Sequence, residues 1–226
     1  MKKFIVIVAG GSGTRMNLAI PKQFIELYGK PILMHTIEAF YKYNQTLQII
    51  LVLPSQQFDY WQKLCQKHGF TIPLQLVAGG ESRFHSVKNG LDSITEDGLV
   101  AIHDGVRPLV SSGTIDRCFA TASQYGNAIP CIPVYETVRQ VENESNVVID
   151  RSTLRMIQTP QVFSCSLIKQ AFAQQTDTDF TDDASVLERT GVKINLVEGN
   201  RENVKVTDML DLTIVEALLK NISARR

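Results

Sequence analysis

The alternation of short apolar runs with segments of helical pattern sets the strongest limit on the fold of this 226-residue chain. The runs are rich in aliphatic and β-branched residues and have the length of strands that are buried on both faces of a sheet. They are Phe4 to Val8, Gln48 to Leu53, Leu74 to Val77, Leu99 to His103 and Ala128 to Ile132. Strands that alternate with helices predict an open, mostly parallel α/β sheet.

Helical patterns fill the gaps between these runs. Pro31 can open a helix in which Ile32, Leu33, Ile37 and Phe40 are spaced for one face. We expect further helices over 57–68, 82–94, 167–174 and 182–189 and from 208 onward, with a strand over 193–197. The predicted fold class is therefore α/β and Rossmann-like, with helices flanking the sheet.

The regular alternation stops between Pro133 and Pro160. Two β-rich runs, Val134 to Arg139 and Val147 to Arg151, flank the polar segment Glu142 to Asn146, which predicts a β-hairpin. A two-stranded ribbon is not stable alone, so it either packs on its own domain or reaches a second subunit. We expect a single domain over 1–226 with a protruding hairpin arm at about 133–160.

The charge balance excludes some classes of protein. With 23 Lys and Arg against 23 Asp and Glu, the chain gives no reason to expect a nucleic-acid or membrane partner. The apolar run after Met1 to Lys3 is too short for a signal peptide, and no segment has the length of a membrane helix. The four cysteines show no paired metal or redox spacing, so we expect a cytoplasmic protein.

A glycine-rich segment directly follows the first expected strand. Glycines let the backbone approach a ligand and direct N–H groups at phosphate oxygens, so the segment is either a phosphate loop or a plain tight turn. It is not a Walker A sequence, which needs Gly-Lys-Ser/Thr at its end. It is not a dinucleotide fingerprint, because Met16 stands where the third glycine would be. The residues expected to bind nucleotide here are Ala9, Gly10, Gly11, Ser12, Gly13 and Thr14.

Two cations follow on the same loop excursion. Arg15 comes directly after Thr14, and Lys22 follows in the segment Pro21 to Phe24. Arg15 offers a planar fork for phosphate oxygens, whereas Lys22 offers a compact point charge. The pair can clasp a triphosphate and stabilise the charge that develops at phosphorus; alternatively, both are solvated loop cations.

A second turn, Gly79 to Arg83, opens the helix expected at 82. Ser82 has the position of an N-cap. Gly80, Glu81 and Ser86 are candidates for contact with the ribose and base of a nucleotide. Glu81 or the nearby backbone can accept from the exocyclic amino group that separates cytosine from uracil.

The fourth expected strand leads into His103 to Pro108, at an edge where ligands of such sheets gather. Asp104 is the candidate magnesium ligand, because Mg²⁺ takes one or two carboxylates beside phosphate oxygens and water. Arg107 is placed for an anionic substrate, although Asp and Arg at this spacing also form simple ion pairs. We expect His103 to pack or to hydrogen-bond rather than to react.

The second half carries hydroxyls and cations in short motifs. Singly, Thr181 has the position of an N-cap, Lys205 that of a surface lysine and Thr159 that of a turn residue. Together with the earlier motifs, they resemble one family over almost the whole chain: the 2-C-methyl-D-erythritol 4-phosphate cytidylyltransferases of the non-mevalonate isoprenoid pathway. The motifs are Gly10 to Met16, Pro21 to Gln23, His103 to Pro108, Thr159 to Gln161, Thr181 to Ser185 and Asn203 to Thr207.

The resemblance implies transfer of CMP from CTP to 2-C-methyl-D-erythritol 4-phosphate, with release of pyrophosphate and with Mg²⁺ or another divalent cation as cofactor. It implies that Arg15 and Lys22 stabilise the pentacoordinate transition state and that Arg151 and Lys205 position the acceptor phosphate. It also implies a homodimer in which the arm carries Arg151 to the neighbouring subunit. The pocket-lining residues that it implies are Asp104, Arg107, Thr137, Thr159 and Thr181, with Thr137 also acting across the interface.

The chain departs from the family pattern in two places. Gly105 and Val106 replace the pair of alanines that many relatives carry after the aspartate, and 17–20 is less glycine-rich than usual. Neither departure removes a charged group. The implied chemistry also needs no catalytic base, because a phosphate nucleophile is already an anion and requires mainly positioning and positive charge.

Other functions compete with this one. A ribitol 5-phosphate cytidylyltransferase would share the fold and the first two motifs, and a more distant nucleotidyltransferase would use UTP or GTP to make a nucleotide sugar. A non-catalytic nucleotide-binding module is disfavoured, because Arg15, Lys22, Asp104, Arg151 and Lys205 are all present. A dehydrogenase is disfavoured by the failed glycine fingerprint.

Overall fold

The computed structural model describes residues 1–10 and 20–224, the last three of these by their backbone only. The expected nucleotide-binding residues Gly11, Ser12, Gly13 and Thr14 and the expected catalytic Arg15 lie outside the described residues. In the part of the chain that is described, no helix is long and apolar enough to cross a membrane.

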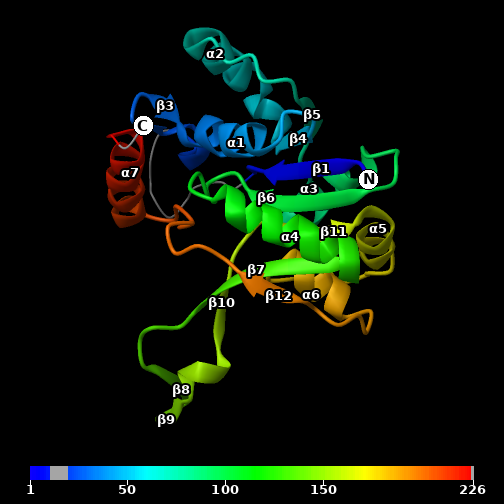
Figure 1. Cartoon of the computed structure of the whole chain (residues 1–226), viewed down its shortest axis with the longest axis vertical. Helices are drawn as coiled ribbons and strands as arrows, with labels where there is room; N and C mark the ends of the chain where they lie inside the picture. Colours follow the sequence, from blue (N-terminus) through cyan, green and yellow to red (C-terminus); the bar gives the residue numbers. More distant parts are fainter. Residues whose placement is uncertain (11–19, 225–226) are drawn as a thin grey trace.

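A central sheet runs through the molecule with the strand order β10-β7-β11-β6-β1-β4-β5, and β12 pairs with β7 (Figure 1). The five strands expected from the sequence are all present. They are β1 (Lys3–Val8), β4 (Gln48–Leu53), β5 (Gln75–Ala78), β6 (Leu99–Asp104) and β7 (Asn127–Pro133). Because β1 is parallel to both β4 and β6, and β4 to β5, the predicted mostly parallel sheet is confirmed.

Helices follow the strands along the chain. The expected ones are α1 (Ile32–Tyr43), α2 (Phe58–His68), α3 (Arg83–Asp92), α5 (Cys165–Ala173), α6 (Asp183–Glu188) and α7 (Met209–Ala224). α1 begins directly after Pro31, as predicted. One helix, α4 (Ser112–Tyr125), was not predicted from the sequence, although its buried Ile115, Cys118, Phe119 and Ala122 have helical spacing.

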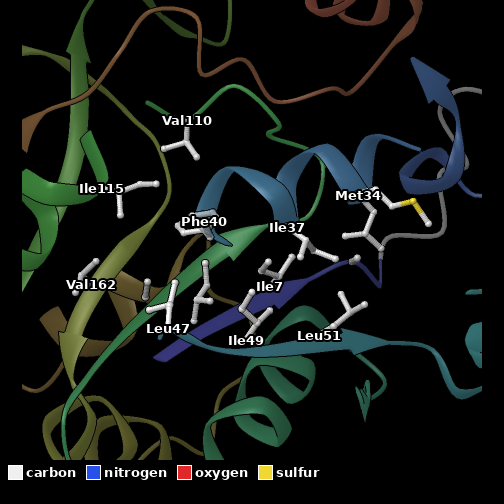
Figure 2. Close-up of a cluster of buried hydrophobic side chains, with 14 of the residues drawn as sticks. Ile7, Met34, Ile37, Phe40, Leu47, Ile49, Leu51, Val110, Ile115 and Val162 are labelled. Atoms are coloured by element: carbon white, nitrogen blue, oxygen red, sulfur yellow. The ribbon is translucent and has the colours of Figure 1, made fainter. Parts of the chain in front are cut away.

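The two faces of β1 divide the core into two layers. Ile5 and Ile7 pack in a cluster with side chains of α1, α2 and α4, whereas Phe4 and Val6 pack in a second cluster with α3, α5 and α6. Successive strand residues point to opposite faces, so one strand serves both layers. Figure 2 shows Ile7 facing the side chains of α1 in the first cluster.

Two strands of the second half were missed. β11 (Gln161–Ser164) lies between β6 and β7 and is antiparallel to both. β10 (Arg155–Ile157) is antiparallel to β7 on its other side. Runs this short carry little periodicity, and the sequence analysis interpreted Thr159-Pro160 only as a turn. The expected strand over 193–197 is observed as β12 (Leu196–Glu198).

The predicted hairpin is formed by β8 (Val138–Glu142) and β9 (Ser145–Ile149) and extends away from the rest of the chain (Figure 1). Its turn is tighter than expected, because Asn143 takes a left-handed conformation with a φ of 51°. Val141, Val147 and Val148 on this hairpin are exposed. A two-stranded ribbon is only marginally stable on its own in water.

Short elements complete the connections around the carboxyl edge of the sheet. They are η2 (Lys22–Phe24), β2 (Glu26–Leu27), β3 (Lys30–Pro31), η3 (Ser55–Gln57) and η4 (Arg151–Thr153). The small β2–β3 ribbon separates Lys22 from α1, and η4 lies at the base of the hairpin.

Close packing of α3 on the sheet predicts one stability difference. A Cβ at Gly90 would lie 2.5 Å from Val6 Cγ1, so Gly90→Ala should lower the free energy of unfolding by about 1 to 3 kcal/mol. Gly113→Ala on α4 is the control, because there the new Cβ meets only the flexible end of Arg117. Gly113→Ala should be neutral or stabilising by up to about 1 kcal/mol. Urea unfolding measures both, and equal effects would contradict the packing argument.

Candidate functional site

The Asp104 carboxylate, at the end of β6, is surrounded by cations. Its Oδ2 lies 3.0 Å from Arg107 Nε and 3.1 Å from Lys205 Nζ, and its Oδ1 lies 4.0 Å from Arg83 Nε. Burial opposes ionisation of this carboxyl, but Lys205, Arg107 and Arg83 outweigh it and hold the pKa of Asp104 well below its usual range. Asp104 is therefore a buried anion at neutral pH, compensated by charges from three segments.

Parallel pairing explains why Asp104 lies beside Val8 and Ala9, at the end of β1. β1 and β6 are in register with Val8 opposite Asp104, so both strands end at the same edge of the sheet. Gly105 N–H donates to the Val8 carbonyl at 2.9 Å. A Cβ at Gly105 would lie 2.8 Å from Ala9 Cβ, so glycine permits this close approach.

Lys22 contacts the segment that carries Lys205. Lys22 Nζ donates to the Val206 carbonyl at 3.2 Å, and Val206 N–H donates to the Val106 carbonyl at 3.0 Å. Arg107 also donates through its guanidinium to the Asn203 carbonyl at 2.9 Å. The segments that carry Lys22, Arg107 and Lys205 are thus joined, although they are far apart in the sequence.

Gln23 joins the segment of Lys22 to the start of the glycine-rich segment. Its side chain is buried, and its Nε2 donates to the Ala9 carbonyl and to Gln57 Oε1, both at 2.8 Å. A buried amide with two partners is well determined in position. Gln23 therefore fixes the point at which β1 leaves the sheet.

The expected contacts for base and ribose lie around the start of α3. Ser86 Oγ donates to the Ser82 carbonyl at 2.9 Å and accepts from Gly80 N–H at 3.1 Å. A Cβ on Gly10 would lie 3.8 Å from Ser86 Oγ, so Gly10 is a neighbour, while Glu81 is exposed. Gly10, Gly80 and Ser86 are brought together, and Ser82 is the predicted N-cap, accepting from His85 N–H.

Arg83 and Asp183 form an ion pair that the sequence analysis did not predict. Arg83 donates to both carboxylate oxygens of Asp183, at 2.8 and 2.6 Å, and Asp183 is almost fully buried. Burial alone would lower the pKa of Arg83, but Asp183 and then Asp104 raise it. Arg83 thus links α3, α6 and Asp104.

The start of α6 corrects one expectation about Thr181. The N-cap is Asp182, whose carboxylate accepts from Ser185 N–H within a capping box, and Thr181 is an exposed residue before it. Gln161 on β11 supports the same turn, because its side chain donates to Asp182 Oδ2 at 2.7 Å. Thr181 is therefore available for other contacts.

Thr159 and His103 lie beneath the Asp104 turn. Thr159 Oγ1 accepts from Asp104 N–H at 3.2 Å and is 3.0 Å from His103 Nδ1. His103 is fully buried, and burial lowers its pKa to about 4. The expectation that His103 packs and hydrogen-bonds is confirmed, because its Nε2 lies 3.0 Å from the Arg107 carbonyl.

The structure does not bring Thr137 and Arg151 to the Asp104 cluster. Both lie at the base of the hairpin and are exposed, and the Arg151 guanidinium donates to the Tyr135 carbonyl. Among the residues that are described, neither side chain shares a hydrogen bond or ion pair with Asp104, Arg107 or Lys205.

The described residues offer little to a metal ion on their own. Over residues 1–10 and 20–224, no group of three or more His, Cys, Asp or Glu side chains is arranged to hold one. Asp104 supplies a single carboxylate. Among the described residues, its Oδ1 has one charged neighbour, Arg83, and that contact is the longest of the three. This donor set fits Mg²⁺ only where ligand phosphates and water complete the coordination.

The fold and the site together define a class. A doubly wound α/β sheet whose carboxyl edge gathers Arg107 and Lys205 around one acidic residue, with Lys22 bound to the nearby Val206 carbonyl, is suited to phosphate-bearing ligands. Comparison with known proteins specifies that class further. Residues 4–221 match the family model of 2-C-methyl-D-erythritol 4-phosphate cytidylyltransferases (IspD), and the chain belongs to this nucleotidyltransferase family.

The similarity to individual relatives extends over almost the whole chain. The chain is 51% identical to 2-C-methyl-D-erythritol 4-phosphate cytidylyltransferase of Bacteroides thetaiotaomicron, covering 97% of this chain and 100% of that one. It is 50% identical to the protein of the same name from Bacteroides fragilis, with the same coverage.

Solved structures match the fold. The 4-diphosphocytidyl-2C-methyl-D-erythritol synthase of Anaerococcus prevotii has a TM-score of 0.83 at 25% identity, covering 97% of this chain and 98% of that one. The 2-C-methyl-D-erythritol 4-phosphate cytidylyltransferase of Thermus thermophilus has a TM-score of 0.78 at 29% identity, covering 97% and 100%.

The Arg83–Asp183 pair predicts a second stability difference. Asp183→Asn leaves Arg83 without its closest countercharge in a buried setting, which should lower the free energy of unfolding by about 3 kcal/mol. Asp92→Asn is the control, because the Lys88–Asp92 pair on the same helix is exposed. Asp92→Asn should change the free energy by no more than about 0.5 kcal/mol. Denaturant unfolding compares them, and a small effect of Asp183→Asn would mean that Arg83 is compensated by Asp104 instead.

Proposed function

We propose that this protein transfers CMP from CTP to 2-C-methyl-D-erythritol 4-phosphate, giving 4-diphosphocytidyl-2-C-methyl-D-erythritol and pyrophosphate. The observation that carries the proposal is the convergence of Lys22, Arg107 and Lys205 at the carboxyl edge of the sheet in a chain of this family. An acceptor phosphate oxygen forms a bond to the α-phosphorus of CTP. The bond between that phosphorus and the bridging oxygen to the β-phosphate breaks, and pyrophosphate leaves with the electron pair.

The chain's own residues supply positive charge and position. The nucleophile is already an anionic oxygen, so no side chain has to remove a proton from it. Lys22, together with Arg15, stabilises the negative charge that develops on the α-phosphate and the leaving group. Arg107 and Lys205 hold the acceptor phosphate, and their common contact with Asp104 fixes their separation.

The nucleotide base and ribose are placed at the start of α3. Gly10 and Gly80 allow close approach of the backbone, and Ala9 and Ser86 fix the two strand-end loops that flank this space. Glu81 is exposed and free to accept from the amino group of cytosine. The residues Gly11 to Thr14 are assigned to phosphate binding from their sequence.

A magnesium ion is part of this proposal. Asp104 would supply the one protein carboxylate, through Oδ1, and ligand phosphates and water would supply the other oxygens. When bound, the ion neutralises phosphate charge and so favours departure of pyrophosphate.

A homodimer is also part of this proposal. The hairpin exposes Val141, Val147 and Val148, which a second subunit would cover. Thr137 and Arg151 lie at the base of the hairpin, and we assign them to the pocket of the neighbouring subunit. Thr181, exposed before α6, and Thr159, below the Asp104 turn, line the acceptor pocket of their own subunit.

A reducing cytoplasm is the proposed location. The described cysteines are all free thiols. Burial raises the pKa of Cys118 to about 12 and that of Cys65 and Cys165 to about 11, so these thiols are poor nucleophiles.

The acceptor and the nucleotide can be tested together. Pyrophosphate release with CTP and magnesium should be fast with 2-C-methyl-D-erythritol 4-phosphate and slow with D-ribitol 5-phosphate at equal concentration. UTP and GTP should be poor replacements for CTP. Preference for the ribitol compound would move the protein to another polyol phosphate, and release with neither acceptor would contradict the proposed reaction.

The shared site can be tested by mixing two inactive variants. Arg15→Ala and Arg151→Ala homodimers should each lose turnover by at least about hundredfold. If Arg151 serves the neighbouring subunit, a random mixture contains heterodimers with one intact site and should recover about a quarter of wild-type activity. Subunits must be exchanged by unfolding and refolding together, with wild-type protein as the control for recovery. An inactive mixture would place Arg151 in the site of its own chain.

A further inference from the structure

His103 makes buried hydrogen bonds beside the site, although the proposed reaction gives it no part. The ring is fully buried and packs edge-to-face with the Phe40 ring, with ring centroids 4.8 Å apart. Its Nε2 lies 3.0 Å from the carbonyl oxygen of Arg107, and its Nδ1 lies 3.0 Å from Thr159 Oγ1. The same Oγ1 lies 3.2 Å from Asp104 N. His103 and Thr159 therefore connect the two ends of the turn from Asp104 to Arg107.

The chemistry of the partners assigns every hydrogen in this chain of contacts. The Arg107 carbonyl can only accept, so His103 Nε2 carries a hydrogen and donates it. Among the described residues, His103 Nδ1 is the one acceptor within reach of the Thr159 hydroxyl hydrogen. Thr159 must then donate its hydroxyl hydrogen to Nδ1, and its oxygen accepts from Asp104 N–H.

Other contacts hold the rest of the turn, and Arg107 N–H closes it by donating to the Asp104 carbonyl at 3.1 Å. Gly105 N–H donates to the Val8 carbonyl, and the Val106 carbonyl accepts from Val206 N–H. The backbone of Asp104 at one end and that of Arg107 at the other are reached by Thr159 and His103. The side chains of Asp104 and Arg107 also meet, because Arg107 Nε donates to Asp104 Oδ2.

We propose that His103 and Thr159 are positioning residues, which hold the Asp104–Arg107 turn through one ordered hydrogen-bond chain from Asp104 N–H to the Arg107 carbonyl. The consequence for the acceptor phosphate rests on the proposed function, because Arg107 is assigned there to that phosphate. His103 has no exposed surface, so any effect of changing it on acceptor binding is indirect.

A matched pair of variants tests the role of the hydroxyl. Thr159→Val keeps the shape of the side chain and removes the hydroxyl, whereas Thr159→Ser keeps the hydroxyl. For Thr159→Val, the KM for the polyol phosphate should rise by about tenfold while the KM for CTP stays within about twofold. Thr159→Ser should restore the KM for the polyol phosphate. Equal kinetics for Thr159→Val and wild type, or equal loss in both variants, would overturn the proposal.

His103→Gln separates positioning from direct contact of Thr159 with the substrate. Glutamine can still donate to the Arg107 carbonyl, but it does not reproduce the Nδ1 acceptor. His103→Gln should raise the same KM as Thr159→Val does, and the double variant should be no worse than either single one. Additive effects would mean that the two residues act independently and would overturn the proposal. This variant also carries the test if Thr159→Val does not fold.

A direct readout does not depend on activity. In the full chain with ¹⁵N-labelled histidine, the His103 ring at neutral pH should give the signals of the neutral Nε2–H form, identified by their loss in His103→Gln. Thr159→Val should shift the Nδ1 signal, and Thr159→Ser should not. A charged ring or the Nδ1–H form would overturn the proposal. If wild type releases no pyrophosphate but shows the Nε2–H form, the proposed function fails while the hydrogen-bond chain stands.

Discussion

The ionised carboxylate of Asp104 is the constraint on which the site depends. A buried anion is costly unless charges and hydrogen bonds compensate it, and here Arg107, Lys205 and Arg83 do so from three different segments. The same contacts bring those cations to the carboxyl edge of the sheet. A protein with no net charge thus concentrates positive charge at one place.

The sheet was the part of the fold that the sequence predicted best. Five apolar runs became five strands, and the end of each buried run marked the edge where Ala9 and Asp104 lie. Antiparallel β11 was missed because four residues between a turn and a helix carry no usable period. Only the strand order reveals that it separates β6 from β7.

The sequence pointed to charged residues that the structure brings together, but not to the contacts that join them. Asp104 and Arg107 were chosen from one motif and Lys205 from another, and the structure brings them into contact. Arg83 stood in a turn that was interpreted for nucleotide binding, and nothing local indicated a bidentate partner one hundred residues away in Asp183. The bonds of Thr159 to Asp104 and His103 likewise cross more than fifty residues, a distance at which spacing carries no signal.

The most direct test of this account is the rate of pyrophosphate release by Asp104→Asn, with Asp92→Asn on the exposed face of α3 as control. Without the carboxylate, Arg107 and Lys205 lose the contact that fixes their separation, so kcat/KM should fall by at least about hundredfold in protein whose circular dichroism is unchanged. Asp92→Asn should match wild type. An Asp104→Asn enzyme within about threefold of wild type would contradict the central role of this carboxylate.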